Sequence, residues 1–214
     1  MNRNELLKLF GNEPLFGERV ALSPLTSDKV DLLLNHMLGT LNAPENIKHL
    51  MKKECEEALE DKYHIVFLIY SEAHDFIGYT EFKNLDGTPE IGIDLAEKHQ
   101  GKGYGFETCQ VLINRLFEKT DYEYIAYNAY KYNKASIALA KKLGASYIGC
   151  KSTFDMLKKS EVSNETKTEA EQFDKMLYRI YRLSYRLISY EVRRFFIPFF
   201  RAIYYCRKNL TPIN

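Results

Sequence analysis

The chain has 214 residues, 45% of them hydrophobic and 28% charged, which suits one domain with a substantial core. Its formal net charge of +1 argues against attraction of the whole domain to nucleic acid. No signal-peptide pattern opens the chain and no uncharged apolar run approaches the roughly 18 residues of a membrane span, so we expect a cytoplasmic globular protein.

The first half predicts two helices and a group of strands. In chain order these are a strand at 19–22, helices at 27–37 and 46–60, and strands at 65–70, 76–82 and 91–95. The run 65–70 is apolar throughout, which suits a strand buried on both faces. Turn-forming residues separate the last three strands, and two successive hairpins predict an antiparallel meander.

A glycine-rich turn, Gln100-Gly101-Lys102-Gly103-Tyr104-Gly105, joins the last of these strands to a helix predicted at 106–118. Its glycines let the backbone turn sharply and approach a ligand closely. A helix that starts there directs free N–H groups and a partial positive charge into the turn. With Lys102, these amides predict a cradle for the phosphates of a cofactor. The spacing fits neither a P-loop nor the dinucleotide-binding fingerprint.

The second half predicts a strand at 124–130, a helix at 134–143 that ends before Gly144, and strands beginning near 145 and 174. Residues 155–172 form a long polar connection, either a mobile insertion or an irregular helix. The four cysteines (Cys55, Cys109, Cys150 and Cys206) lack metal-type spacing, so we expect free thiols and no metal site. Cys109 lies on the apolar face of its helix and is interpreted as a core residue.

Three segments carry a resemblance to a known family. Gln100, Gly103 and Gly105 fill the defining positions of a pattern that resembles the Q/R-x-x-G-x-G/A signature of the GNAT superfamily of acyl-CoA-dependent N-acyltransferases. The Asn133-x-x-Ser136 helix start and the strand at 89–95 are similar to two further family segments. The resemblance covers about residues 17–183 and implies an α+β fold. Its central sheet would be mixed and mostly antiparallel, flanked by helices, and splayed where the pantetheine arm of the cofactor inserts.

The resemblance also implies how acetyl-CoA is held. The pyrophosphate would be bound by the loop residues Gln100, Gly101, Lys102, Gly103, Tyr104 and Gly105. Exposed backbone groups of Ile93 and Leu95 would pair with the pantetheine arm in the manner of an added strand. Asn133 would bind the same arm, or cap its own helix.

Acetyl transfer further requires that the amine lose its proton, because a free alkylammonium with a pKa near 10.4 is almost wholly charged at neutral pH. Glu90, ten residues before Gln100, is the predicted base, since several family members carry a glutamate near this position. The alternative is a carboxylate at the rim of the sheet that makes a cross-strand pair. Glu81 and Asp94 are the reserve candidates.

One position departs from the family pattern. Many members carry a tyrosine seven residues after the helix-opening asparagine, where it protonates the departing thiolate, but Ala140 stands here. The subgroup that includes ribosomal-protein N-terminal acetyltransferases has a serine three residues after the asparagine, and Ser136 fits that place. Ser136 would hydrogen-bond the cofactor sulfur, or it is an ordinary first-turn helix residue.

The last segment, 184–214, is predicted as an amphipathic helical tail attached to a domain at 1–183. Between 184 and 208, six basic residues oppose Glu191, and eight large aromatic or isoleucine side chains crowd positions 195–205 around Pro198. Three interpretations stay open: the aromatics pack on the domain or on a second subunit of a homodimer, the tail lies on an anionic membrane surface, or it binds an acidic partner.

Together these features predict an acetyl-CoA-dependent N-acetyltransferase that moves an acetyl group to a primary amine by direct attack on the thioester. The acceptor would be a protein N-terminus or a small amine. No specific nucleic-acid binding is expected. The alternative is a non-catalytic acyl-CoA-binding module whose tail binds a membrane or a partner.

Overall fold

The computed structural model describes residues 3–10, 14–39, 44–152, 174–183 and 185. Its elements, in chain order, are α1 (Arg3–Phe10), β1 (Leu15–Phe16), β2 (Val20–Pro24), the 3-10 turn η1 (Ser27–Lys29), α2 (Val30–Leu38), α3 (Glu45–Glu60), β3 (Ile65–Ser71), β4 (Phe76–Lys83), β5 (Glu90–Leu95), the 3-10 turn η2 (Glu97–His99), α4 (Tyr104–Lys119), β6 (Tyr124–Tyr130), α5 (Lys134–Lys142), β7 (Ser146–Lys151) and β8 (Lys175–Tyr181). None of the helices among these residues is both long and apolar enough to cross a membrane.

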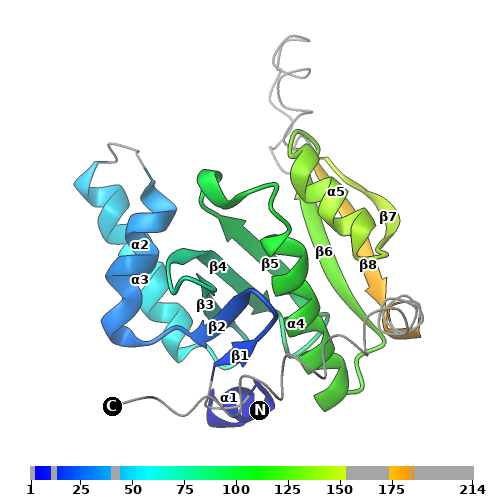
Figure 1. Ribbon diagram of the computed structural model, residues 1–214, viewed down its shortest axis with the longest axis horizontal. Coiled ribbons are helices and arrows are strands. Elements are labelled where there is room, and N and C mark those ends of the chain that lie inside the picture. Colours follow the sequence, from blue (N-terminus) through cyan, green and yellow to red (C-terminus); the bar gives the residue numbers. More distant parts are fainter. Residues whose placement is uncertain (1–2, 11–13, 40–43, 153–173, 184, 186–214) are drawn as a thin grey trace.

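The strands form one eight-stranded sheet in the order β1-β2-β3-β4-β5-β6-β8-β7. All neighbours are antiparallel except β5 and β6, which run parallel. Their register pairs Glu90 with Ala126, and from there the two strands diverge toward the Leu95 end of β5 (Figure 1). The predicted meander and the α+β architecture are therefore confirmed, and the splay lies between β5 and β6.

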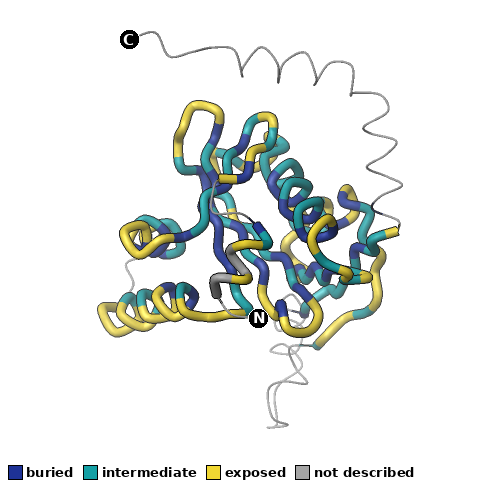
Figure 2. Tube along the Cα trace, turned by 90° about the horizontal axis from the view of Figure 1, so that it is seen from below, coloured by how far each residue is buried: buried dark blue, intermediate teal, exposed yellow. Residues whose placement is uncertain are grey.

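Two cores lie on opposite faces of this sheet, because alternate residues of β3 point to opposite sides. Ile65, Phe67 and Ile69 belong to the larger core, which contains the inner faces of α1, α4 and α5. Val66 and Leu68 belong to a smaller core with α2 and α3. Buried residues accordingly run along the strands and inner helix faces, whereas the connecting turns are exposed (Figure 2).

Helix α1 and strand β1 were not predicted. Helix α1 has eight residues, too few to show a clear helical period, but Phe10 is fully buried and packs against Phe67 and Phe82 at ring distances of 5.3 and 5.9 Å. Tertiary packing rather than local propensity thus stabilises α1.

The cysteine and tail predictions are only partly covered by the described residues. Cys55, Cys109 and Cys150 are free thiols, and burial raises the pKa of the Cys109 thiol to about 12, so Cys109 is a core residue as expected. The predicted connection at 155–172 and nearly all of the predicted tail lie outside these residues. Tyr185, at the start of that tail, is 3% exposed and packs against Phe117 of α4.

Candidate functional site

A cavity of about 410 Å³ lies where β5 and β6 diverge, between the glycine loop and α5. The residues predicted to hold a cofactor and found in its lining are Ile93, Leu95, Gln100, Gly101, Gly103, Gly105, Asn133 and Ser136. Lys102 and Tyr104 were predicted with them but do not line the cavity. The fold therefore brings three sequence segments together around one space.

The glycine loop has the conformation that its sequence predicts. Gly101 and Gly103 have φ angles of 70° and 90°, in the left-handed region that favours glycine, and Gly103 directly precedes the first turn of α4. The side-chain amide of Gln100 donates a hydrogen bond of 2.8 Å to the carbonyl oxygen of Leu95, which ties the loop to the end of β5. The first backbone N–H groups of a helix have no partner within the helix, and Gly103 and Gly105 at the start of α4 both line the cavity.

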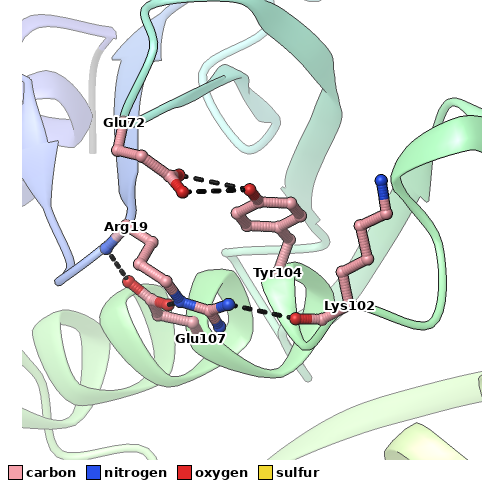
Figure 3. A network of polar contacts seen from close by, with 5 residues as sticks. All are labelled: Arg19, Glu72, Lys102, Tyr104 and Glu107. Carbon is pink, nitrogen blue, oxygen red and sulfur yellow. Dashed lines mark hydrogen bonds and ion pairs between the residues drawn. The ribbon is translucent and has the colours of Figure 1, made fainter.

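A second set of contacts braces the loop from outside (Figure 3). The Arg19 guanidinium pairs with Glu107 of α4 at 3.1 Å and donates to the carbonyl oxygen of Lys102, also at 3.1 Å. It also lies 5.0 Å from the centre of the Tyr104 ring, whose hydroxyl donates to Glu72. Tyr104 therefore braces the loop, whereas Lys102 takes part in these contacts through its carbonyl oxygen.

On the other side of the cavity, α5 and β6 contribute polar groups. The Asn133 side-chain oxygen accepts a 2.9 Å hydrogen bond from the backbone N–H of Ser136, so Asn133 caps α5. The Ser136 hydroxyl lies 2.9 Å from the hydroxyl of Tyr127, which is 2% exposed and also lines the cavity. Burial raises the pKa of Tyr127, so this hydroxyl keeps its proton at neutral pH. The arrangement is a two-hydroxyl chain that ends in the cavity.

The candidate bases lie on the opposite face of β5. Glu90 begins this strand and Asp94 is its next-to-last residue, and Asp94 contributes to the cavity lining whereas Glu90 does not. The Asp94 carboxylate contacts His36 of α2 at 2.9 Å. Glu81 on β4 lies over Gly92, where its carboxylate fills the space that a side chain would occupy.

Both carboxylate oxygens of Glu81 are engaged. Oε2 lies 2.8 Å from His64 and Oε1 lies 2.9 Å from the Lys83 ammonium. Burial alone would raise the pKa of Glu81, but the hydrogen bonds from His64 and Lys83 outweigh it and hold the pKa below its ordinary value. Glu81 is therefore an ionised, fully engaged carboxylate.

A cavity lined by a glycine loop at a helix start, in a sheet splayed between two parallel strands, agrees with one known family. The family model of the Acetyltransferase (GNAT) domain matches residues 19–146. The chain belongs to the GNAT acetyltransferase family. This membership confirms the resemblance seen in the sequence and makes the protein an acetyltransferase. A search of curated proteins finds no significant match.

Solved structures show the same GNAT fold at low sequence identity. RimL, a ribosomal L7/L12 alpha-N-protein acetyltransferase in complex with coenzyme A, is 18% identical with a TM-score of 0.61, and the match covers 79% of this chain and 98% of that one. A probable acetyltransferase from Chromobacterium violaceum is 16% identical over 80% and 87% of the two chains, with a TM-score of 0.61. Mutant forms of the spermidine/spermine N-acetyltransferase SpeG from Vibrio cholerae are 15% identical over 80% and 98%, also at 0.61.

Sequence reasoning missed Tyr127, which lines the cavity, and Arg19 and His36, which contact residues beside it. Tyr127 had a detectable signal, since it is an inward-facing polar residue on a strand that was predicted correctly. Arg19 and His36 had none, because their partners are Glu107, 88 residues away, and Asp94, 58 residues away.

Proposed function

We propose that this GNAT protein transfers the acetyl group of acetyl-CoA to a primary amine by direct attack of the amine on the thioester. The observation that carries the proposal is the single cavity shared by the glycine loop, the free edge of β5 and the start of α5. The likeness to RimL, whose structure contains coenzyme A, supports the same cofactor class.

The cofactor would lie across the cavity from the loop to α5. Backbone amides at the start of α4 would bind the diphosphate, helped by the partial positive charge of the helix. The backbone of Ile93 and Leu95 would pair with the pantetheine arm, because the register between β5 and β6 ends at Glu90 and leaves this edge to a ligand. The amide oxygen of Asn133 is used by the helix cap, so its amide nitrogen is the group that remains for the arm.

In the reaction the amine nitrogen forms a bond to the thioester carbonyl carbon, and the bond from that carbon to sulfur then breaks. The departing thiolate would accept a hydrogen bond from the Ser136 hydroxyl, which Tyr127 orients from 2.9 Å away. This pair would replace the tyrosine that is absent at Ala140. The proton that the amine releases balances the one that the thiolate finally takes up. The amine must lose a proton as the new bond forms, and the carboxylates on the far face of β5 are the candidates to attract it.

The acceptor would be a protein N-terminus or a small amine, since RimL and SpeG by their names act on these two kinds of substrate. A cytoplasmic location belongs to the same proposal, and the free thiols Cys55, Cys109 and Cys150 suit a reducing compartment.

The test has two stages. Calorimetry of the full-length protein with coenzyme A should detect binding to one site. Release of free thiol from acetyl-CoA should then rise on addition of spermidine or a serine-led peptide. Binding without turnover on any amine would instead favour a non-catalytic acyl-CoA-binding module, and absence of binding would remove the proposed cofactor.

A further inference from the structure

The end of β5 carries different chemistry on its two faces. Side chains alternate along a strand, so Ile93 and Leu95 point to one face and Asp94 to the other. Ile93 and Leu95 lie close to Gly105 of α4, where an added Cβ would meet them at 3.7 and 3.6 Å. Asp94 pairs in register with Tyr79 and faces α2. A charged group thus stands directly behind the strand edge that borders the cavity.

His36 holds this carboxylate in one orientation. Its Nε2 lies 2.9 Å from Oδ2 of Asp94, and its ring packs edge-on against Phe76 and Tyr79 at centroid distances of 5.4 and 5.8 Å. The His36 side chain is 9% exposed, whereas Asp94 is 54% exposed. Packing therefore fixes the histidine, and the histidine fixes one carboxylate oxygen. The other oxygen, Oδ1, has no hydrogen-bond partner within the described part of the chain.

The cavity side and the α2 side of the sheet meet at this end of β5. Beyond Glu90, β5 and β6 have no register pair within the described residues, and the cavity opens between them. Asp94 contributes to the cavity lining together with Ile93 and Leu95. A thioester held along that edge would therefore be reachable from the α2 side, next to a carboxylate that has one oxygen to offer.

We propose that Asp94 is the carboxylate that binds the ammonium group of the acceptor, and that His36 is its positioning residue. The inference rests on the proposed function and names its substrate class, a cationic primary amine. Ion pairing would hold the ammonium group beside the thioester until the proton is lost, and a carboxylate with a fixed rotamer requires less ordering on binding.

The other two carboxylates of this face fit the role less well. Glu81 has both oxygens occupied by His64 and Lys83. Glu90 lies at the opposite end of β5, where this strand is still paired with β6. The residues of β5 that line the cavity are at its other end.

The experiment measures steady-state acetyl transfer by the full-length protein to spermidine, to a serine-led peptide and to aniline, which is uncharged at neutral pH. Asp94→Asn should raise KM for the two cationic acceptors by about 10- to 100-fold, the value of a hydrogen bond to a charged group. KM for acetyl-CoA and for aniline should stay within about twofold, because neither depends on that charge.

His36 is tested by two substitutions. His36→Phe keeps the packing against Phe76 and Tyr79 but removes the donor, and it should raise KM for the cations by about 3- to 10-fold. His36→Gln restores a donor and should recover most of the loss. Asp31→Asn is the matched control, since this exposed carboxylate of α2 pairs with Lys52 away from the cavity, and it should change nothing.

Each result decides between the two proposals. Unchanged KM for the cations in Asp94→Asn, or an equal rise for aniline, would overturn the ammonium site while leaving the acetyltransferase intact. A wild-type protein that acetylates aniline but neither cationic acceptor would also overturn the ammonium site and leave the acetyltransferase activity intact. A wild-type protein that transfers to no acceptor overturns both proposals.

Discussion

The two faces of β5 differ in how they obtain specificity. On the α4 and α5 side, the cavity lining includes glycines, the hydroxyls of Ser136 and Tyr127, and the apolar residues Ile93 and Leu95. On the α2 side, the same strand and its neighbour β4 carry Asp94 and Glu81, each held by a histidine. A single strand can therefore present apolar side chains on one face and charged side chains on the other, because its side chains alternate.

Different kinds of contact stabilise the two faces. The proposed cofactor side depends on backbone conformation at glycines, so glycine substitutions should affect it most. The proposed acceptor side carries ion pairs between residues far apart in the chain, so charge substitutions should affect it most.

Gly78→Ala should damage both faces together. Gly78 has a φ of 152°, and an added Cβ would lie 2.2 Å from the backbone oxygen of Asp94. Neither backbone can move without changing the β4–β5 register, so we expect a loss of unfolding free energy on the order of 3 kcal/mol or more. Urea denaturation measures it, with Gly87→Ala as control because nothing lies within 4 Å there. Equal stability of the two variants would contradict the prediction.

Ser136→Ala should affect the cofactor face alone. Loss of the hydroxyl that we propose to stabilise the thiolate should lower kcat about 100-fold, and Tyr127→Phe about tenfold, with KM for both substrates nearly unchanged. Steady-state kinetics checks both. Tyr178→Phe is the matched control, since this tyrosine is equally buried opposite Tyr127 on β8 but does not line the cavity. A similar loss of kcat in the control would assign the effect to packing.

Glu81→Gln should lower the free energy of unfolding, because Glu81 makes ion pairs on the α2 side of the sheet. Removing the charge weakens the contacts of this side chain with His64 and Lys83, and about 1–3 kcal/mol of unfolding free energy should be lost. Because the folded-state pKa of Glu81 is depressed, its contribution is complete above the ordinary glutamate pKa and is lost as the pH falls through the folded value. Denaturation at neutral and acidic pH tests this, and the wild type and variant should converge in acid.

The matched control for this substitution is Glu57→Gln. Glu57 pairs with Lys53 on the exposed side of α3, where its side chain is 66% exposed, so its loss should be near zero. A difference between wild type and Glu81→Gln that is independent of pH would argue against the ion pair as its cause.

Gly103→Ala should have a smaller effect than the three preceding substitutions. It should weaken the binding of coenzyme A at the proposed cofactor site. A φ of 90° costs an alanine about 1–2 kcal/mol, and its Cβ would lie 3.0 Å from the Arg19 guanidinium. The loop would relax away from this conformation, and coenzyme A affinity should fall about tenfold by calorimetry. Unchanged affinity would show that the amides of this loop do not bind the diphosphate.

Glu90→Gln should have the smallest effect. Since Glu90 lies outside the cavity lining, kcat/KM for amines should change by less than about threefold. A loss of about 100-fold or more would instead identify Glu90 as the base, as its sequence position predicted, and would move the acceptor toward the paired end of β5.

Much of the fold could be predicted because its signals are local. The apolar run 65–70 indicated a strand buried on both faces, and Gly144, with a φ of 75°, ends α5 where a helix-ending glycine was expected. The glycine loop was predicted with its conformation, since left-handed φ angles need glycine. Helix α1 was missed because its stabilisation comes from Phe10 packing on β3 and β4.

The sequence by itself determined the family, the order of the elements from β2 onward and the segments that border the cavity, because hydrophobic period and glycine placement act over a few residues. Only the tertiary structure decided which polar side chains meet. His36 reaches Asp94 across 58 residues, and Arg19 reaches Glu107 across 88. Such pairs depend on how each helix packs on the sheet, and that packing is set by the whole core rather than by any local pattern.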